Sequence, residues 1–214
     1  DRNINVSSTS PHSCADGGDG VNYSVTALTS NTATVTPSPA AGCLSAGDQV
    51  LVINLQGKTS GVTNTGNWEI LDVQSVASAI VTFTSNKTNY YGDGASDDSN
   101  IGTGATNQKV MLQRVPNYTD LTVNSSMSFY SSAWDGLKGG VMAFKSNGTI
   151  TVNGNISVTG KGYRGPFTDA ASAISSGDGG EGPCGIGGLG VASAGVGGNG
   201  AGGGGGYSTG GTGG

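Results

Sequence analysis

Few side chains of this 214-residue chain are placed to do acid–base chemistry. His12 is the single histidine, and no motif of a Ser–His–Asp or Cys–His arrangement flanks it in its Ser- and Pro-containing leader. Glu69 and Glu181 are the only glutamates, and Glu69 has no identifiable carboxylate partner of the kind that glycoside hydrolysis needs. The sequence therefore predicts a protein without catalytic residues.

Two acidic loops, Asp16–Gly20 and Gly92–Asn100, are rich in hard oxygen ligands. Ca²⁺ takes about six to eight such oxygens, often from loops, but neither loop has the glutamate that ends an EF-hand loop. Asp, Gly and Asn are also the favoured turn residues. We expect either solvated turns or a Ca²⁺ site at Asp93, Asp97 and Asp98, and no other cofactor.

Three cysteines are present, and Cys14 and Cys43 bracket two short runs typical of strands. A disulfide between them would close a loop of about 30 residues and add roughly 3–4 kcal/mol of stability. Cys184 stands alone in a Gly-rich tract, either free or paired with another chain. Without a Cys-x-x-Cys pair, we expect no thiolate metal site.

Composition and charge exclude several classes of protein. Glycine contributes 41 residues, charged residues only 11%, and the net charge is −5, which argues against a helical bundle and against nucleic-acid binding. Six prolines are too few for collagen, and no apolar run is long enough to span a bilayer. The Ser, Thr, Asn and Gly content is typical of secreted proteins, and the sequence opens at Asp1 without a signal peptide, as a processed chain would.

Two further features are compatible with an extracellular, glycan-related role. Asn-x-Ser/Thr sequons, which mark possible glycosylation in exposed loops, occur at Asn5, Asn22, Asn86, Asn117, Asn124, Asn147 and Asn155. Aromatic residues could stack on sugars, although such residues more often pack in a core; they are Tyr90, Tyr91, Tyr118, Tyr130, Trp134 and Tyr163.

Residues 1–115 are predicted to form a small antiparallel barrel or sandwich. The expected strands are Val21–Thr26, Thr32–Thr36, a strand within Gly47–Gly57, Asn67–Val73, Ala79–Thr84 and Lys109–Val115. The run within Gly47–Gly57 carries apolar residues on both faces, which is typical of a strand buried on both sides.

Residues 116–165 contain shorter apolar runs separated by Asn and Gly. The hexapeptides Thr149–Gly154 and Asn155–Gly160 form a near-repeat, in which Ile150 matches Ile156 and Val152 matches Val158. This pattern favours stacked solenoid rungs with inward Ile and Val. A hairpin with a turn at Asn153-Gly154 is the alternative.

Residues 166–214 form a Gly-rich tail, with Gly at every third position over 179–188 and 197–206. That spacing would suit a polyglycine-II-like helix, which has about three residues per turn. The same composition would equally suit a flexible segment.

Several strings of the chain resemble a glycine-rich family of large bacterial cell-surface proteins of gliding and filamentous bacteria. They are Ser45–Gly57, Asn67–Val76, Lys109–Asn124, Ala133–Gly165 and the closing Gly-rich stretch, and together they cover roughly residues 45–214. The resemblance implies a secreted or surface-exposed, non-enzymatic module linked to adhesion, gliding or extracellular structure.

We therefore expect an extracellular structural protein that is a surface module or a self-assembling fibre subunit. A glycan-binding adhesin of bacterial or phage origin is the alternative, and a polysaccharide-active enzyme is a third reading. The alternating segment Asn3, Ile4, Asn5 and Val6 is predicted to add as a strand to a neighbouring copy, giving head-to-tail association.

Overall fold

The computed structural model describes residues 2–5, 14, 18–58, 62–164 and 181–183. The predictions for Val6, for Cys184 and for the Gly-rich tail outside Glu181–Pro183 lie outside the described residues. Regular structure in the described part consists of β-strands and a 3₁₀ turn, η1 (Gly18–Gly20). The prediction of an all-β fold with an antiparallel sheet is confirmed.

Six antiparallel strands close into a barrel in the order β2-β3-β6-β5-β4-β7, with β7 paired back to β2. The strands are β2 (Asn22–Leu28), β3 (Thr32–Thr36), β4 (Gln49–Gln56), β5 (Trp68–Ala77), β6 (Ile80–Phe83) and β7 (Lys109–Val115). The sequence did not distinguish a barrel from a sandwich; in the structure, the pairing of β2 with β7 closes the sheet into a barrel. Closure pairs both edges of every barrel strand.

The barrel interior is filled by alternate residues of its strands, because successive side chains of a strand point to opposite faces. Val50 and Val52 of β4 lie in this core, together with Leu112 of β7 and Phe83 of β6. Strands β5 and β6 form a hairpin, with Ala77 paired to Ile80 across a two-residue turn.

The double-sided burial predicted for β4 also appears in the structure. Val50 and Val52 face the barrel core, whereas Ile53 and Leu55 belong to a second apolar cluster. This strand is therefore covered on both faces, and its outer face is where the rest of the chain packs.

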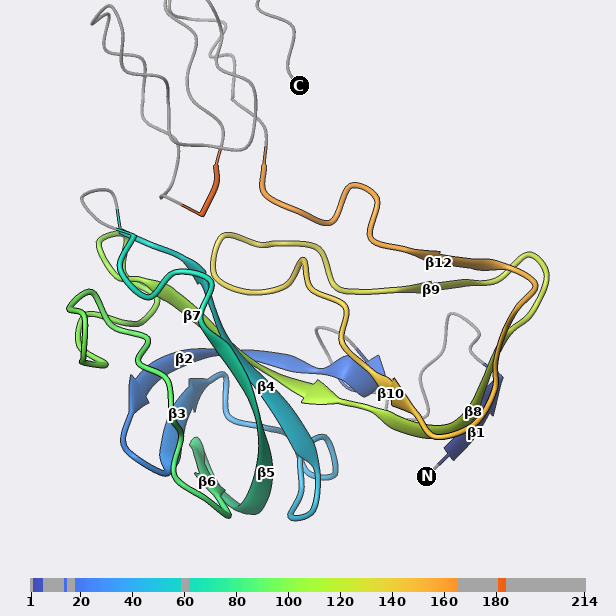
Figure 1. Ribbon diagram of the computed structural model, residues 1–214, viewed down its shortest axis with the longest axis horizontal. Helices are drawn as coiled ribbons and strands as arrows, with labels where there is room; N and C mark the ends of the chain where they lie inside the picture. Colours follow the sequence, from blue (N-terminus) through green and yellow to red (C-terminus); the bar gives the residue numbers. More distant parts are fainter. Residues whose placement is uncertain (1, 6–13, 15–17, 59–61, 165–180, 184–214) are drawn as a thin grey trace, which may run out of the picture.

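Parallel strands continue from the end of β7 (Figure 1). Strand β8 (Asn117–Val123) follows β7 after one proline and pairs in parallel with β1 (Arg2–Asn5), β10 (Lys145–Ser146) and β11 (Ile150–Val152). Strand β9 (Ser128–Tyr130) pairs in parallel with β12 (Asn155–Ser157). The strands of residues 145–157 thus lie against those of residues 117–130, one layer beside the other.

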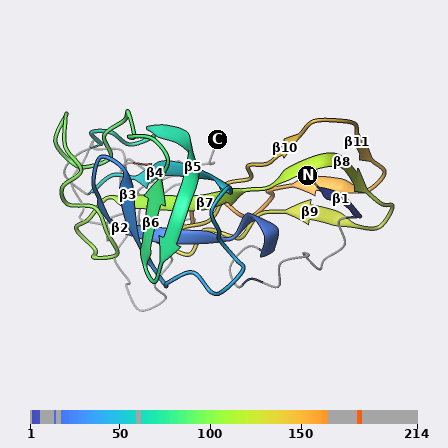
Figure 2. The same ribbon diagram turned by 90° about the horizontal axis from the view of Figure 1, so that it is seen from below.

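The layers project from the barrel, so the described molecule is elongated (Figure 2). A third apolar cluster contains the buried Tyr118, Leu121 and Val123 of β8, with the partly buried Phe129 of β9 and Phe144, just before β10, packed against them. The rings of Phe129 and Phe144 meet edge to face, 5.0 Å between centroids. Aromatic and aliphatic contacts thus hold the two layers together.

The two hexapeptides, Thr149–Gly154 and Asn155–Gly160, adopt neither of the two predicted arrangements. Strand β11 pairs with β8, and β12 pairs with β9, so the two hexapeptides follow one another within one layer. They neither stack on each other nor form the alternative hairpin. Asn153 and Gly154 instead donate their amides to the carbonyl of Val123, which makes them a corner of the outer layer.

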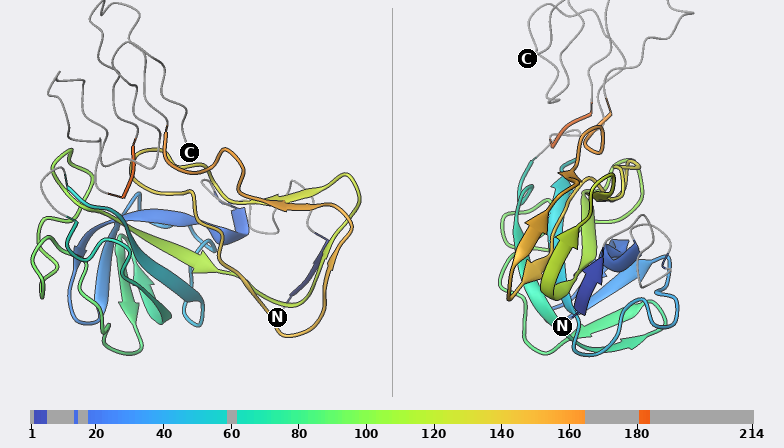
Figure 3. Two further views of the ribbon diagram at one scale, coloured as in Figure 1. Left: turned by 45° about the horizontal axis from the view of Figure 1, so that its top comes forward. Right: turned by 90° about the vertical axis from the view of Figure 1, so that its right-hand side faces the viewer.

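Ile150, Val152, Ile156 and Val158 were expected to face inward, and each is exposed by more than a third. The residues paired with Ile150 and Val152, which are Leu121 and Val123 of β8, are fully buried. Ile150 and Val152 stay exposed because β11 lies at the edge of its sheet, where, among the described residues, it has a neighbouring strand on one side only (Figure 3).

Candidate functional site

Residues of the segment between β9 and β10, together with Tyr163 after β12, lie on the outer face of β4 and β7, a region that we call the junction. Its apolar residues are Ile53, Leu55, Met111, Trp134, Val141 and Tyr163. The Trp134 and Tyr163 rings pack edge to face with centroids 5.2 Å apart. The Tyr163 hydroxyl donates to the Leu55 carbonyl. The junction therefore fixes the layers to the barrel.

Glu181 closes the junction through its carboxylate. Its Oε2 accepts hydrogen bonds from the Trp134 indole at 2.8 Å and from Arg164 Nε at 2.9 Å, and its Oε1 accepts from Arg164 Nη2 at 2.6 Å. Partial burial disfavours the ionised carboxylate, but the hydrogen bonds from Arg164 and Trp134 outweigh it and lower the pKa of Glu181. Glu181 thus acts as a structural anion.

Glu181–Pro183 also contact the end of β4. Gln56 Nε2 donates to the Gly182 carbonyl at 2.9 Å, and the Gly57 amide donates to the Pro183 carbonyl at 2.7 Å. These bonds hold a short piece of the Gly-rich tail on the barrel. The sequence gives no signal for this contact, because Glu181 stands alone among glycines and its partners Arg164 and Trp134 lie 17 and 47 residues away.

A partly buried ionic network also fixes the start of β8 to the end of the barrel strand β7. Arg114 Nη1 lies 2.7 Å from Asp19 Oδ1, and Arg114 Nε lies 2.9 Å from Asp48 Oδ1. The Tyr118 hydroxyl, at the start of β8, donates to Asp19 Oδ2 at 3.0 Å. One carboxylate therefore joins η1, β7 and β8. Sequence reasoning missed this network because its members are separated by up to 99 residues.

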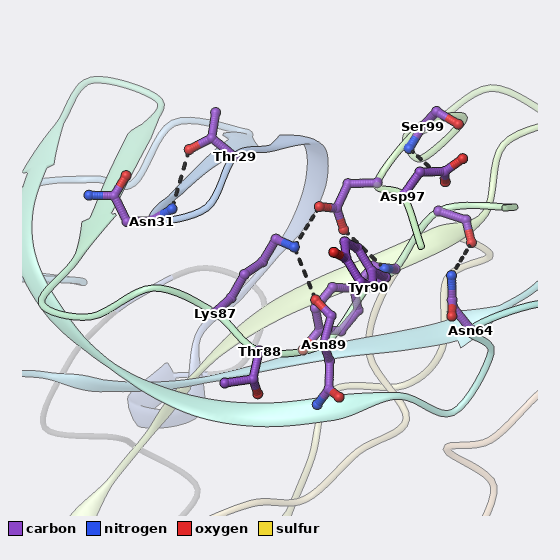
Figure 4. A network of polar contacts seen from close by, with 12 residues as sticks. Thr29, Asn31, Asn64, Lys87, Thr88, Asn89, Tyr90, Asp97 and Ser99 are labelled. Carbon is purple, nitrogen blue, oxygen red and sulfur yellow. Dashed lines mark hydrogen bonds and ion pairs between the residues drawn. The ribbon is translucent and has the colours of Figure 1, made fainter. Parts of the chain in front are cut away.

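The predicted calcium ligands each bind a donor of the protein itself. Asp93 pairs with Lys58 and accepts from Asn100, and the hydrogen bond from Lys58 is the main cause that lowers the pKa of Asp93 to about 2. Asp97 Oδ1 accepts the backbone amides of Gly94 and Ser99 at 3.2 Å, as a turn residue does (Figure 4).

Asp98 is turned to Lys87, whose Nζ lies 2.5 Å from Asp98 Oδ2 and also donates to the Asn89 carbonyl (Figure 4). The three aspartates thus point to separate partners. In the described ranges, no group of three or more His, Cys, Asp or Glu side chains is close enough together to hold a metal ion. Calcium binding at Asp93, Asp97 and Asp98 stays a prediction.

Glu69, considered above as a carboxylate at a sugar site, points into the barrel. It accepts hydrogen bonds from the amides of Thr88 and Asn89 and from the Tyr91 hydroxyl at 2.9 Å. Burial opposes its ionisation, but these bonds lower the pKa of Glu69, while burial and the neighbouring carboxylate raise that of Tyr91. Glu69 therefore fastens the loop over the barrel end.

The aromatic residues divide into packed and exposed groups. Tyr91, Tyr118 and Trp134 are buried, and Tyr163 packs on Trp134. Tyr90 and Tyr130 are 43% and 51% exposed, and Trp68 of β5 is 57% exposed. The Lys87 ammonium lies 4.9 Å from the Tyr90 ring centroid, a cation–π distance.

Cys14 and Cys43 form a disulfide with 5.8 Å between their Cα atoms, as predicted. Among the sequons, Asn22 is buried and donates to Ser132 Oγ at 3.2 Å, so it cannot carry a glycan in the folded protein. Asn117 is half-buried, and Asn5 lies in β1. The exposed sequons are Asn86, Asn124, Asn147 and Asn155.

The predicted assembly segment is a strand of its own molecule. Arg2–Asn5 form β1, in which Ile4 is paired with Leu121 and Asn5 with Thr122 of β8. The segment therefore adds to a parallel sheet, as its alternation suggested, but in the same chain. Pairing with a neighbouring copy stays a prediction.

No family model matches the sequence, and no curated protein shows significant similarity to it. Among solved structures, the chain is similar to the tailspike gp61 of Pseudomonas phage phi297, with 22% identity over 67% of this chain and a TM-score of 0.28. It is also similar to the Gp54 tailspike of Acinetobacter baumannii bacteriophage AP22, solved with a capsular saccharide, with 14% identity over 64% of this chain and a TM-score of 0.28. The matches span 20% and 24% of those chains, and similarity at this level assigns neither fold nor function. Within the described residues, no helix is long and apolar enough to cross a membrane.

Proposed function

We propose that this chain is a non-catalytic structural module of an extracellular surface protein. Its barrel is the base on which a solenoid-like stack of parallel β layers begins. The observation that carries the proposal is the in-register parallel pairing of β8 with β11 and of β9 with β12, directly after the last barrel strand. A repeating parallel layer can be extended by further turns of chain, which gives an elongated stem.

The polar groups of the molecule support a structural role. Glu69 and Glu181 have lowered pKa values and hold loops in place, so at neutral pH each is an ionised acceptor and not a proton donor. The disulfide between Cys14 and Cys43 favours an oxidising, extracellular compartment.

Cysteine pairs test the parallel register directly. Thr122 and Thr151 are partners, and partners in neighbouring strands lie about 4.8 Å apart, within the range that a disulfide spans. The double variant Thr122→Cys/Thr151→Cys, made with Cys184→Ser, is expected to oxidise to an additional disulfide that peptide mapping detects.

The matched control is Thr122→Cys/Ser157→Cys in the same background. Ser157 lies in β12, which pairs with β9 and not with β8, so this pair is expected to stay reduced. Reduced thiols in the Thr122/Thr151 variant, or equal oxidation of both pairs, would contradict the proposal.

Glycan binding is a second candidate, favoured by the exposed Tyr90 ring above Lys87. A cation beneath one ring face fixes the ring, and the other face can stack on a sugar. Titration with neutral and acidic oligosaccharides is expected to shift the NMR signals of Tyr90, and Tyr90→Ala should abolish binding. Equal binding by Tyr90→Ala and by the unaltered chain would exclude this site.

The fibre form of the proposal requires β1 to pair with β8 of another copy. Sedimentation of the full chain and of a chain lacking residues 1–10 tests this exchange. Concentration-dependent association of the full chain alone would support it, and two monomeric species would exclude it.

A further inference from the structure

Two exposed aromatic rings lie on adjoining segments of the barrel. Trp68, the first residue of β5, is 57% exposed, and Tyr90, between β6 and β7, is 43% exposed. Asn67 Nδ2 donates to the Tyr90 carbonyl at 2.9 Å. In return, Asn89 Nδ2 donates to the Trp68 carbonyl at 2.9 Å. These two reciprocal hydrogen bonds clamp the segments of Trp68 and Tyr90 side by side.

Both rings point away from the barrel interior. The residue after Trp68 is Glu69, which points into the barrel and accepts from the Tyr91 hydroxyl at 2.9 Å. Successive side chains of a strand point to opposite faces, so Trp68 points outward. Tyr91 is fully buried in the barrel core, whereas its neighbour Tyr90 is not, so Tyr90 is turned outward as well. The clamped segments therefore present two neighbouring rings to the surroundings.

The polar groups beside the rings are amides and hydroxyls. Asn67 Nδ2 also lies 3.3 Å from Asn64 Oδ1, so both of its protons are used and Asn67 Oδ1 is the atom that remains to accept a hydrogen bond. Thr88 is exposed, and its hydroxyl donates to Glu69 Oε2 at 3.1 Å, so the Thr88 oxygen can also accept. Fixed acceptors next to a ring are suited to orient a ligand that carries hydroxyl groups.

The charges next to the rings are balanced within the protein. The Lys87 ammonium lies 4.9 Å from the Tyr90 ring centroid and 2.5 Å from Asp98 Oδ2, and it also donates to the Asn89 carbonyl (Figure 4). The whole chain has a net charge of −5, which disfavours an anionic polymer. The electrostatics of this surface therefore favour an uncharged ligand.

A sugar chain fits this surface better than an apolar partner does. A pyranose ring has a face of C–H groups, which packs on an aromatic ring, and an edge of hydroxyl groups, which needs hydrogen bonds. An apolar partner would cover Asn67 and Thr88 without giving them hydrogen bonds, and burial of unpaired polar groups costs free energy. Because the two rings lie on separate segments, one linear glycan can stack on both.

We propose that Trp68 and Tyr90 form one binding surface for a neutral polysaccharide. Each ring stacks on a different sugar residue of the same glycan chain, and Asn67 Oδ1 accepts from a hydroxyl group beside them. This surface deepens the glycan-binding candidate, on which it rests, because it adds Trp68 to the site and identifies uncharged sugars as the ligands. A second copy of the chain on the same surface is the alternative that the test separates.

Calorimetric titration of the full chain with neutral oligosaccharides of glucose, mannose, galactose and N-acetylglucosamine tests the surface. At least one should bind, its monosaccharide should bind more weakly, and an oligogalacturonate should not bind. Trp68→Ala and Tyr90→Ala should each weaken binding by about tenfold or more. The matched control is Tyr130→Ala, because Tyr130 is 51% exposed and lies 5.1 Å from the Lys161 ammonium, but in β9, outside the barrel. This control should bind like the unaltered chain.

Unchanged binding by Trp68→Ala, with binding lost in Tyr90→Ala, would overturn the two-ring surface and leave the Tyr90 candidate standing. Failure of every neutral oligosaccharide to bind, or tighter binding of the oligogalacturonate, would overturn both. Acrylamide quenching of Trp68 is the third measurement, since the other tryptophan, Trp134, is buried. Protection of Trp68 that grows with protein concentration in the absence of glycan would show that a second copy occupies the surface. The Thr122/Thr151 disulfide tests the structural proposal independently of all these outcomes.

Discussion

The barrel and the parallel layers are built from similar short strands, but they bury their apolar residues by different means. The barrel is closed, so Leu112 and Val50 are surrounded by the same six strands. The layers are open, so Leu121 is fully buried while its partner Ile150 is not. Burial in the barrel depends on strand closure, whereas burial of a strand in the layers depends on whether a neighbouring strand or side chain lies against it.

Core truncation should separate the two regions most strongly. Leu112→Ala removes a fully buried side chain of the barrel and is expected to lower the free energy of unfolding by about 2–5 kcal/mol. Ile150→Ala, on the outer layer, should cost less than about 1.5 kcal/mol. Urea unfolding of both variants measures the difference, and equal losses would contradict the distinction between a closed and an open core.

The disulfide should affect the barrel and not the layers. Cys14 packs against the barrel core and Cys43 is part of it, so Cys14→Ser/Cys43→Ser should lower barrel stability by roughly 3–4 kcal/mol, the value for a loop of about 30 residues. The amide exchange of β11 and β12, measured under native conditions, should be unchanged. If amide exchange became faster only in the layers, the disulfide would stabilise the layers and not the barrel, which would contradict this prediction.

A glycine at the corner of the outer layer tests the spacing between the layers. A methyl group at Gly154 would lie 2.3 Å from the carbonyl oxygens of Asn124 and Met127, which belong to the inner layer. Gly154→Ala is therefore expected to cost about 1–3 kcal/mol. Gly162→Ala is the matched control, because no atom lies within 4 Å of its added methyl group. Equal thermal stability of the two variants would contradict the close approach.

Much of the barrel could be predicted from the sequence. Strand β3 alternates buried and less buried residues, and β4 carries apolar residues on both faces, so local pattern and tertiary burial agree. The partners of these strands could not be predicted, because alternation does not say which strands pair. The same limit explains the outcome for the hexapeptides, whose partners lie 27 to 29 positions earlier and not in the adjacent repeat.

The junction was harder to predict than the strands. Trp134 and Tyr163 were expected as sugar-stacking candidates, and the structure packs them on the barrel. Glu181 and Asp19 act through partners far along the chain, and an isolated acidic residue among glycines gives no sequence signal for such a contact. The disulfide could be predicted because both cysteines flank the first two barrel strands.

The smallest expected effect concerns pH at the junction. Because the folded-state pKa of Glu181 is lowered, its contribution to stability is present above its unfolded pKa, near 4.5, and is lost as the pH falls through the folded value. Glu181→Gln should reduce stability by about 1 kcal/mol or less at neutral pH and should flatten the acid side of the profile. Thermal melts between pH 3 and 7 measure both effects, and an unchanged profile would exclude the linkage.

The central claim is that β8 is an inner strand of a parallel sheet and β11 is paired to it. Site-resolved amide exchange by NMR tests this most directly, because the Leu121 amide donates to the Thr149 carbonyl and the Asn153 amide donates to the Val123 carbonyl. The account predicts slow exchange at Leu121 and Asn153 together. Rapid exchange at Leu121, with mutual protection of Ile150–Val152 and Asn155–Ser157 as in a hairpin, would contradict it.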